Sequence, residues 1–120
     1  MAIKDKINIL QDVNGYLGAG IFTPQGEMLE GVADVSGIHF ETSGSQVHDT
    51  LLNAQKMSSE AGFGAADMIQ IDTEMGIVFC KCFNDGDLHF HTVLVIKSDG
   101  NIAMAKMKMK KFVNEVKSEF

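Results

Sequence analysis

The 120-residue chain contains no arginine, no tryptophan and only one proline. Arginine is the preferred residue for bidentate phosphate recognition and for fingers inserted into phosphoryl-transfer sites, so the chain can supply no such finger to itself or to a partner. Without tryptophan, it has no indole anchor for an interface. The ten cationic residues are all lysines, and the net charge of −6 argues against a nucleic-acid-binding or anionic-membrane-binding surface.

Long apolar runs are also missing. No window reaches the length of about 20 apolar residues that a membrane span needs. The N-terminal MAIKDKINIL is charged from Lys4 onward and lacks the uninterrupted apolar core of a signal peptide. Cys80 and Cys82 are two residues apart and, on one strand, would lie at the edge of disulfide reach. We therefore expect reduced thiols and a cytoplasmic protein.

The size and composition are those of an ordinary globular domain. A chain of 120 residues is long enough to bury roughly two thirds of its unfolded surface. Residues 1–120 are therefore expected to form a single domain without stabilising cross-links. It is 45% hydrophobic and 22% charged, which is typical of soluble globular proteins.

The most informative segment is NGYLGAGIFTPQGEMLEGVA, residues 14–33. It predicts two short apolar strands, over 16–22 and 27–32, joined by a turn at residues 23–26. Proline pre-sets the backbone at the second turn position, and glycine suits the fourth. Apolar residues at helical spacing predict a short helix over residues 3–12 before this hairpin.

The remainder of the chain predicts a long helix, three strands and a final helix. Residues 34–43 are expected to be a loop, and the glycines at 62 and 64 to end the long helix. The strands are expected over 67–72, 77–83 and 88–96, with Asn84-Asp85-Gly86-Asp87 as a hairpin signal. The predicted order is helix-strand-strand-helix-strand-strand-strand-helix. It indicates an α+β fold with a five-stranded antiparallel sheet covered by helices.

With these elements in place, the chain resembles the roadblock family, which includes the dynein light chains of that name, and specifically its bacterial or archaeal single-domain members. LGAGIFTPQGEMLEGVA is similar to the family's opening strands. IDTEMGIVFCKCFNDGDLHFHTVLVIKSDGNIAMAKMKMKK is similar to its three closing strands and the Asn-led start of its last helix. The similarity covers nearly the whole chain and consists of patterns, not of a catalytic signature.

The resemblance implies a profilin-like fold, with the long helix on one sheet face and the N- and C-terminal helices on the other. It also implies a homodimer that binds small Ras-like GTPases or acts as an adaptor, and requires no cofactor. In the family, the long helix and the short third strand usually form the dimer interface. The corresponding residues here are Val47, Leu51, Ala54, Ser58, Ala61, Met68, Ile69 and Gln70. An unpaired edge at that short strand agrees with this implication.

The residues that could carry chemistry are two cysteines and two histidines on the predicted central hairpin. With a two-residue Asp85-Gly86 turn, Cys82 would face His89 and Cys80 would face His91, all on one side of the sheet, whereas an odd-length loop would separate the pairs onto opposite faces. These residue types suit zinc or another transition metal. A flat patch, however, would approach a metal from one hemisphere only. The preferred interpretation is therefore a half-buried patch under a helix, with cysteine acting as a small hydrophobe.

The leading functional hypothesis is a non-enzymatic homodimeric scaffold that regulates a small Ras-like GTPase. No nucleophile in the sequence has an identifiable base and orienter at informative spacing, so no enzyme is predicted. The alternative is a sensory module of the same fold that binds a ligand or a metal through the cysteine and histidine patch.

Overall fold

The computed structural model describes residues 6–33, 44–84 and 88–117. Its five strands form one sheet in the order β2-β1-β5-β4-β3, and each neighbouring pair is antiparallel. The strands are β1 (Tyr16–Phe22), β2 (Met28–Ala33), β3 (Met68–Asp72), β4 (Ile77–Asn84) and β5 (His89–Ile96). The helices are α2 (Asn8–Gln11), α3 (Gly44–Glu60) and α4 (Ile102–Lys117). This arrangement confirms the predicted α+β fold.

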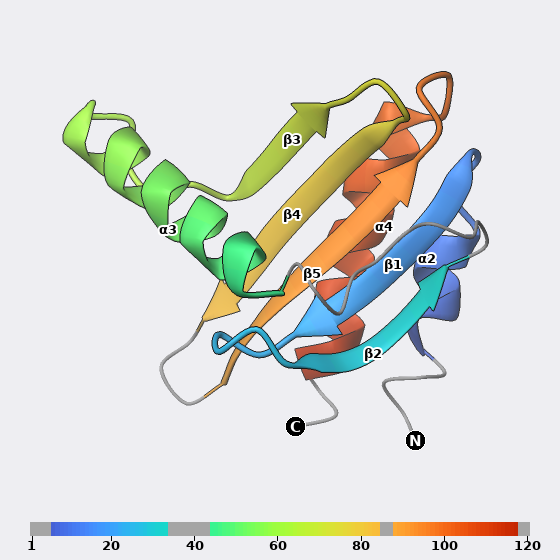
Figure 1. Cartoon of the computed structure of the whole chain (residues 1–120), viewed down its shortest axis with the longest axis horizontal. Helices are drawn as coiled ribbons and strands as arrows, with labels where there is room; N and C mark the ends of the chain where they lie inside the picture. The colour runs from blue at the N-terminus through green and yellow to red at the C-terminus, as the bar shows by residue number, and fades with distance from the viewer. Residues whose placement is uncertain (1–5, 34–43, 85–87, 118–120) are drawn as a thin grey trace.

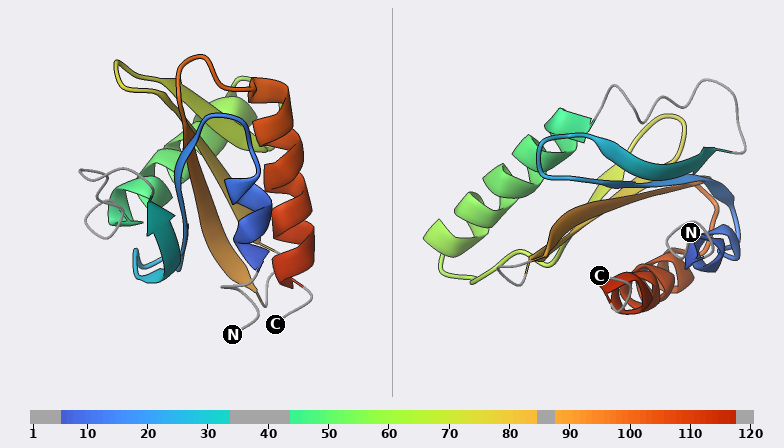
Figure 2. Two further views of the ribbon diagram at one scale, coloured as in Figure 1. Left: turned by 90° about the vertical axis from the view of Figure 1, so that its right-hand side faces the viewer. Right: turned by 90° about the horizontal axis from the view of Figure 1, so that it is seen from below.

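The helices lie on opposite faces of the sheet (Figures 1 and 2). The short α2 and the long α4 cover one face, and α3 crosses the other near β3 and β4. Because side chains alternate along a strand, the four strands β1, β3, β4 and β5 each contribute to two separate apolar clusters. The larger cluster lies between the sheet and α2 and α4, and includes Phe79, Phe90 and Phe112. The smaller cluster lies under α3 and includes Leu51 and Val93.

A helix was expected over residues 3–12. Within the described residues, Lys6 is helical, a turn follows at Ile7, and α2 spans Asn8–Gln11; residues 1–5 lie outside the described part of the chain. So short a helix has little stability of its own and depends on tertiary packing. Ile7 and Leu10 supply that packing, because both are buried against α4 and the sheet.

One apolar stripe of the closing helix α4 is buried. Its buried positions are Ala105, Met109, Phe112, Val113 and Val116. The side-chain oxygen of Asn101 accepts a hydrogen bond of 2.9 Å from the N–H of Met104, so this residue caps the first turn. Among the described residues, no helix combines the length and apolar character needed to cross a bilayer.

Candidate functional site

The candidate site is a hollow between α3 and the sheet, on the face opposite α4. It has a volume of about 400 Å³. The wall from α3 includes His48, Leu51, Leu52 and Gln55, and the chain entering β3 adds residues 66–69. The hairpin of β4 and β5 contributes Cys82, Asn84, His89 and His91. The cysteine and histidine patch therefore opens into a cavity and is not simply covered by α3.

The strand register corrects the predicted pairing within this patch. Cys82 lies opposite His91, and Asn84 lies opposite His89, so the expected pairing of Cys82 with His89 is wrong. Cys80 faces Val93, not His91. The connection between the strands is longer than the two residues assumed, and loop length sets the register of a hairpin. The shift is even, so all four side chains stay on the face that carries α3.

Three of the predicted side chains come together. Potential ligand atoms of Cys82, His89 and His91 lie within 4.8 Å of one another, and the Cys82 Sγ to His89 Nε2 distance is 3.4 Å. Cys80 is not part of this group, because its side chain packs in the apolar cluster beside Leu51. The structure thus divides the predicted four-residue set into a polar trio and one buried hydrophobic thiol.

A fourth group comes from α3 and was not predicted. His48 Nδ1 lies 3.0 Å from His91 Nε2, and the rings of these two residues are 5.2 Å apart between centroids. His48 and Leu51 are three residues apart, so a helix presents both toward the sheet. That spacing is the signal in the sequence that could have placed His48 over the patch.

Burial favours the uncharged forms of Cys82, His89 and His91. Burial, with smaller contributions from His89 and His48, lowers the pKa of His91 to about 4. Burial and the neighbouring His48 also lower the pKa of His89. The pKa of the Cys82 thiol is raised by burial despite the nearby charge of Lys81. Neutral imidazoles and a protonated thiol are therefore the forms expected at neutral pH.

One polar atom of the site has no hydrogen-bond partner within the described residues. It is His91 Nδ1, on a side chain that is only 1% exposed. A buried ring nitrogen without a partner costs free energy, and its presence calls for an explanation. The other ring nitrogen of His91 is the one that contacts His48.

The residues implied as a dimer interface divide between two environments. Val47 and Leu51 pack into the apolar cluster on the sheet, as does Ile69 from β3. Ala54, Ser58 and Met68 are partly buried, whereas Ala61 and Gln70 are exposed. The strand β3 forms an edge of the sheet, as expected.

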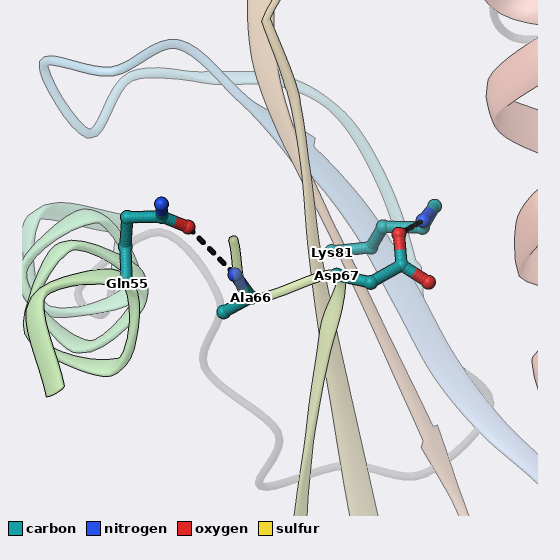
Figure 3. Close-up of polar contacts among 4 residues, drawn as sticks. All are labelled: Gln55, Ala66, Asp67 and Lys81. Carbon is teal, nitrogen blue, oxygen red and sulfur yellow. Dashed lines mark hydrogen bonds and ion pairs between the residues drawn. The ribbon is translucent and has the colours of Figure 1, made fainter. Parts of the chain in front are cut away.

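Two polar contacts fix the chain where it enters β3 (Figure 3). The side-chain oxygen of Gln55 on α3 accepts a hydrogen bond of 2.8 Å from the N–H of Ala66. Asp67 pairs with Lys81 of β4 at 2.5 Å, on the sheet face opposite α3. Neither contact was predicted, because each joins residues whose proximity depends on the strand register and on the position of α3.

Sequence comparisons with known proteins give no match. No protein-family model matches the chain, and neither does any curated protein. Any relationship visible in the sequence is therefore restricted to patterns of the kind described above.

Comparison with solved structures gives matches over nearly the whole chain. MglB of Myxococcus xanthus is similar with a TM-score of 0.82 and 10% identity, over 98% of this chain and 94% of that protein. A roadblock/LC7 domain of Streptomyces avermitilis matches with a TM-score of 0.79 and 11% identity, over 93% and 91% of the two chains. This chain has the roadblock/LC7 fold.

A third match is an MglB with a tetrameric arrangement. It has a TM-score of 0.73 and 15% identity, over 93% of this chain and 85% of the other. At such low identities, the roadblock/LC7 fold is what these similarities establish. They confirm the resemblance noted in the sequence at the level of architecture.

Proposed function

We propose that this chain is a non-enzymatic, homodimeric scaffold of the cytoplasm that binds a small Ras-like GTPase. The observation that carries the proposal is the roadblock/LC7 fold over nearly the full length, shared with MglB. Roadblock proteins often bind and regulate such GTPases, as the sequence resemblance implied. In this role, residues 1–120 act as one binding domain.

The proposed dimer interface combines the edge strand β3 with the outer face of α3. An edge strand presents unpaired backbone groups, which a second copy can pair. Large apolar side chains are exposed nearby: Met57 on α3 is 65% exposed, and Ile71 on β3 is 39% exposed. In Figure 1, the C-terminal end of α3 extends past β3, so both elements are accessible from the same side.

The absence of arginine limits how such a scaffold can affect GTP hydrolysis. An inserted arginine stabilises charge in the transition state of phosphoryl transfer, and this chain has none to insert. Any stimulation would therefore act by positioning groups of the GTPase itself. A bound GTPase with unchanged turnover is equally compatible with the scaffold role.

The interface can be tested by comparing two exposed methionines on opposite faces. Met57→Asp on α3 should shift the protein from dimer to monomer in analytical ultracentrifugation. Met107→Asp on α4 should leave the dimer intact, because Met107 is 60% exposed and lies on the other side of the sheet. Leu51 is unsuitable for this purpose because it is buried within the protomer. A dimeric, folded Met57→Asp variant would place the interface elsewhere.

The partner can be tested by affinity purification of the tagged chain from its native host, followed by mass spectrometry. The proposal expects a small GTPase in stoichiometric yield, with binding that depends on the nucleotide. Failure of the host's small GTPases to bind in both the GDP and the GTP state would refute the GTPase part. The dimer would then remain as a separate question, decided by the methionine variants.

A further inference from the structure

We propose that Cys82, His89 and His91 form a zinc-binding site at the base of the hollow under α3. The three side chains come from two adjacent strands, and their potential ligand atoms lie within 4.8 Å of one another. One thiolate and two imidazoles are a donor set that zinc prefers. This site is independent of the proposed GTPase partner and lies on the inner, not the outer, side of α3.

The distances fit a shared metal ion. With zinc-nitrogen bonds of about 2.0 Å and zinc-sulfur bonds of about 2.3 Å, a tetrahedral site places a sulfur and a nitrogen ligand roughly 3.5 Å apart. Cys82 Sγ and His89 Nε2 are 3.4 Å apart. This pair therefore has the separation of two ligands of one metal ion. The third ligand atom, from His91, lies within 4.8 Å of the other two.

The sequence argued against a metal site because four ligands on one pair of strands would all approach the ion from the same side. The observed arrangement removes this argument. The structure instead leaves three ligands on the sheet, which is the number that can occupy one side of a tetrahedral ion. A fourth coordination position then faces the hollow, which supplies an entry path for the ion and room for a water molecule.

The unpartnered nitrogen of His91 supports the same assignment. With its Nε2 in contact with His48, the buried Nδ1 has no partner among the described residues. Histidine ligands of metals commonly engage one nitrogen with the ion and the other with an outer group that fixes the ring. His48 is placed to be that outer group, and its role is to position His91.

Zinc binding at this site releases one proton. The Cys82 thiol loses its proton to solvent as the sulfur-zinc bond forms, and the neutral imidazoles donate lone pairs without losing a proton. Zinc keeps its +2 charge, so no oxidant or reductant is involved. The ion replaces water ligands by protein ligands, and the fourth position retains one water.

The two cysteines provide a matched test. Both lie on β4 on the same face of the sheet, but only Cys82 belongs to the trio. Untagged full-length protein is titrated with Zn²⁺ by calorimetry and with Co²⁺ by absorbance, which reports cobalt-thiolate bonding directly. We expect one ion per chain, a thiolate charge-transfer band, loss of both in Cys82→Ala, and retention of both in Cys80→Ala.

A positioning role for His48 predicts a smaller effect. His48→Gln should weaken zinc affinity by about 10–100-fold while the cobalt-thiolate band persists at saturating metal, as expected when an outer partner is removed. Circular dichroism of each metal-free variant verifies that it is folded. No stoichiometric zinc in the folded wild type, or equal loss of metal in Cys80→Ala and Cys82→Ala, would overturn the proposal. A cobalt complex without a thiolate band would do so as well.

Discussion

The ion pair of Lys81 with Asp67 allows the cost of a buried charge to be measured. The Lys81 side chain is 9% exposed, whereas that of Asp67 is 71% exposed (Figure 3). The hydrogen bond from Lys81 lowers the pKa of the Asp67 carboxyl, against the smaller opposing effect of burial. A lysine within the sheet is thus neutralised by a group that remains largely in water.

The expected magnitudes follow from this asymmetry. Breaking a fully buried pair costs about 3–5 kcal/mol, and an exposed pair contributes about 1 kcal/mol or less. We therefore expect Asp67→Asn to reduce the free energy of unfolding by about 1–2 kcal/mol at neutral pH. Lys81→Met retains the aliphatic stem but removes the charge, so it should be neutral or stabilising.

The pH dependence provides a second readout. Because the folded-state pKa of Asp67 is lowered, its contribution to stability is complete above the ordinary carboxyl pKa of about 4. That contribution is lost as the pH falls through this value and then through the lower folded-state pKa. The stability difference between wild type and Asp67→Asn should therefore shrink below about pH 4.

Urea denaturation followed by circular dichroism measures the stability difference at neutral pH and its decrease near pH 3.5. The lower pH is about half a unit below the ordinary carboxyl pKa. Asp99→Asn is the matched control, because Asp99 is exposed in the connection between β5 and α4. It should change stability by less than about 0.5 kcal/mol. The reasoning is refuted if Asp67→Asn is as stable as wild type at neutral pH. It is also refuted if Lys81→Met is less stable than Asp67→Asn.

Three further predictions concern the packing around α3 and β3. Gln55→Ala removes the hydrogen bond to the chain before β3, and should cost about 1 kcal/mol and accelerate exchange of that amide in hydrogen-exchange experiments. Leu51→Ala should cost about 2–3 kcal/mol in urea denaturation, whereas Leu52→Ala, one residue along and 45% exposed beside the hollow, should cost less than about 0.5 kcal/mol. Gly76→Ala should cost about 2 kcal/mol by the same assay, because an added Cβ would overlap a backbone carbonyl of β5; a stability equal to wild type would contradict the close approach.

The layered fold could be predicted because it depends on local patterns. Alternating apolar residues marked the strands, helical spacing marked α3 and α4, and turn residues marked most of the boundaries. Gly62 and Gly64 both adopt positive φ where the long helix was expected to end. The turn at Ile7 before α2 was not predicted, and α2 depends on packing against α4 more than on its own propensity.

The candidate site was predicted only in part, because its geometry depends on long-range placement. The residue types in Cys82, His89 and His91 were visible in the sequence, but their pairing depended on a hairpin connection longer than assumed. His48 lies 43 residues before His91 and meets it only because α3 crosses this part of the sheet. Lys81 lies between the two cysteines of β4, so alternation places it on the opposite face, whereas its pairing with Asp67 follows from the β3-β4 register.

The two proposals share the helix α3, and this sharing has a thermodynamic consequence. Its inner side contributes His48 to the zinc site, and its outer side contributes Met57 to the proposed dimer interface. If zinc binds more tightly when α3 is packed on the sheet, it must strengthen dimer formation that also requires α3 in that position. By the same coupling, dimer formation must strengthen zinc binding. Zinc should therefore lower the dimer dissociation constant of the wild type and leave that of Cys82→Ala unchanged, as measured by sedimentation with and without Zn²⁺. Equal dissociation constants in wild type with and without bound zinc would show that α3 is equally docked in both states, and that the two sites act independently.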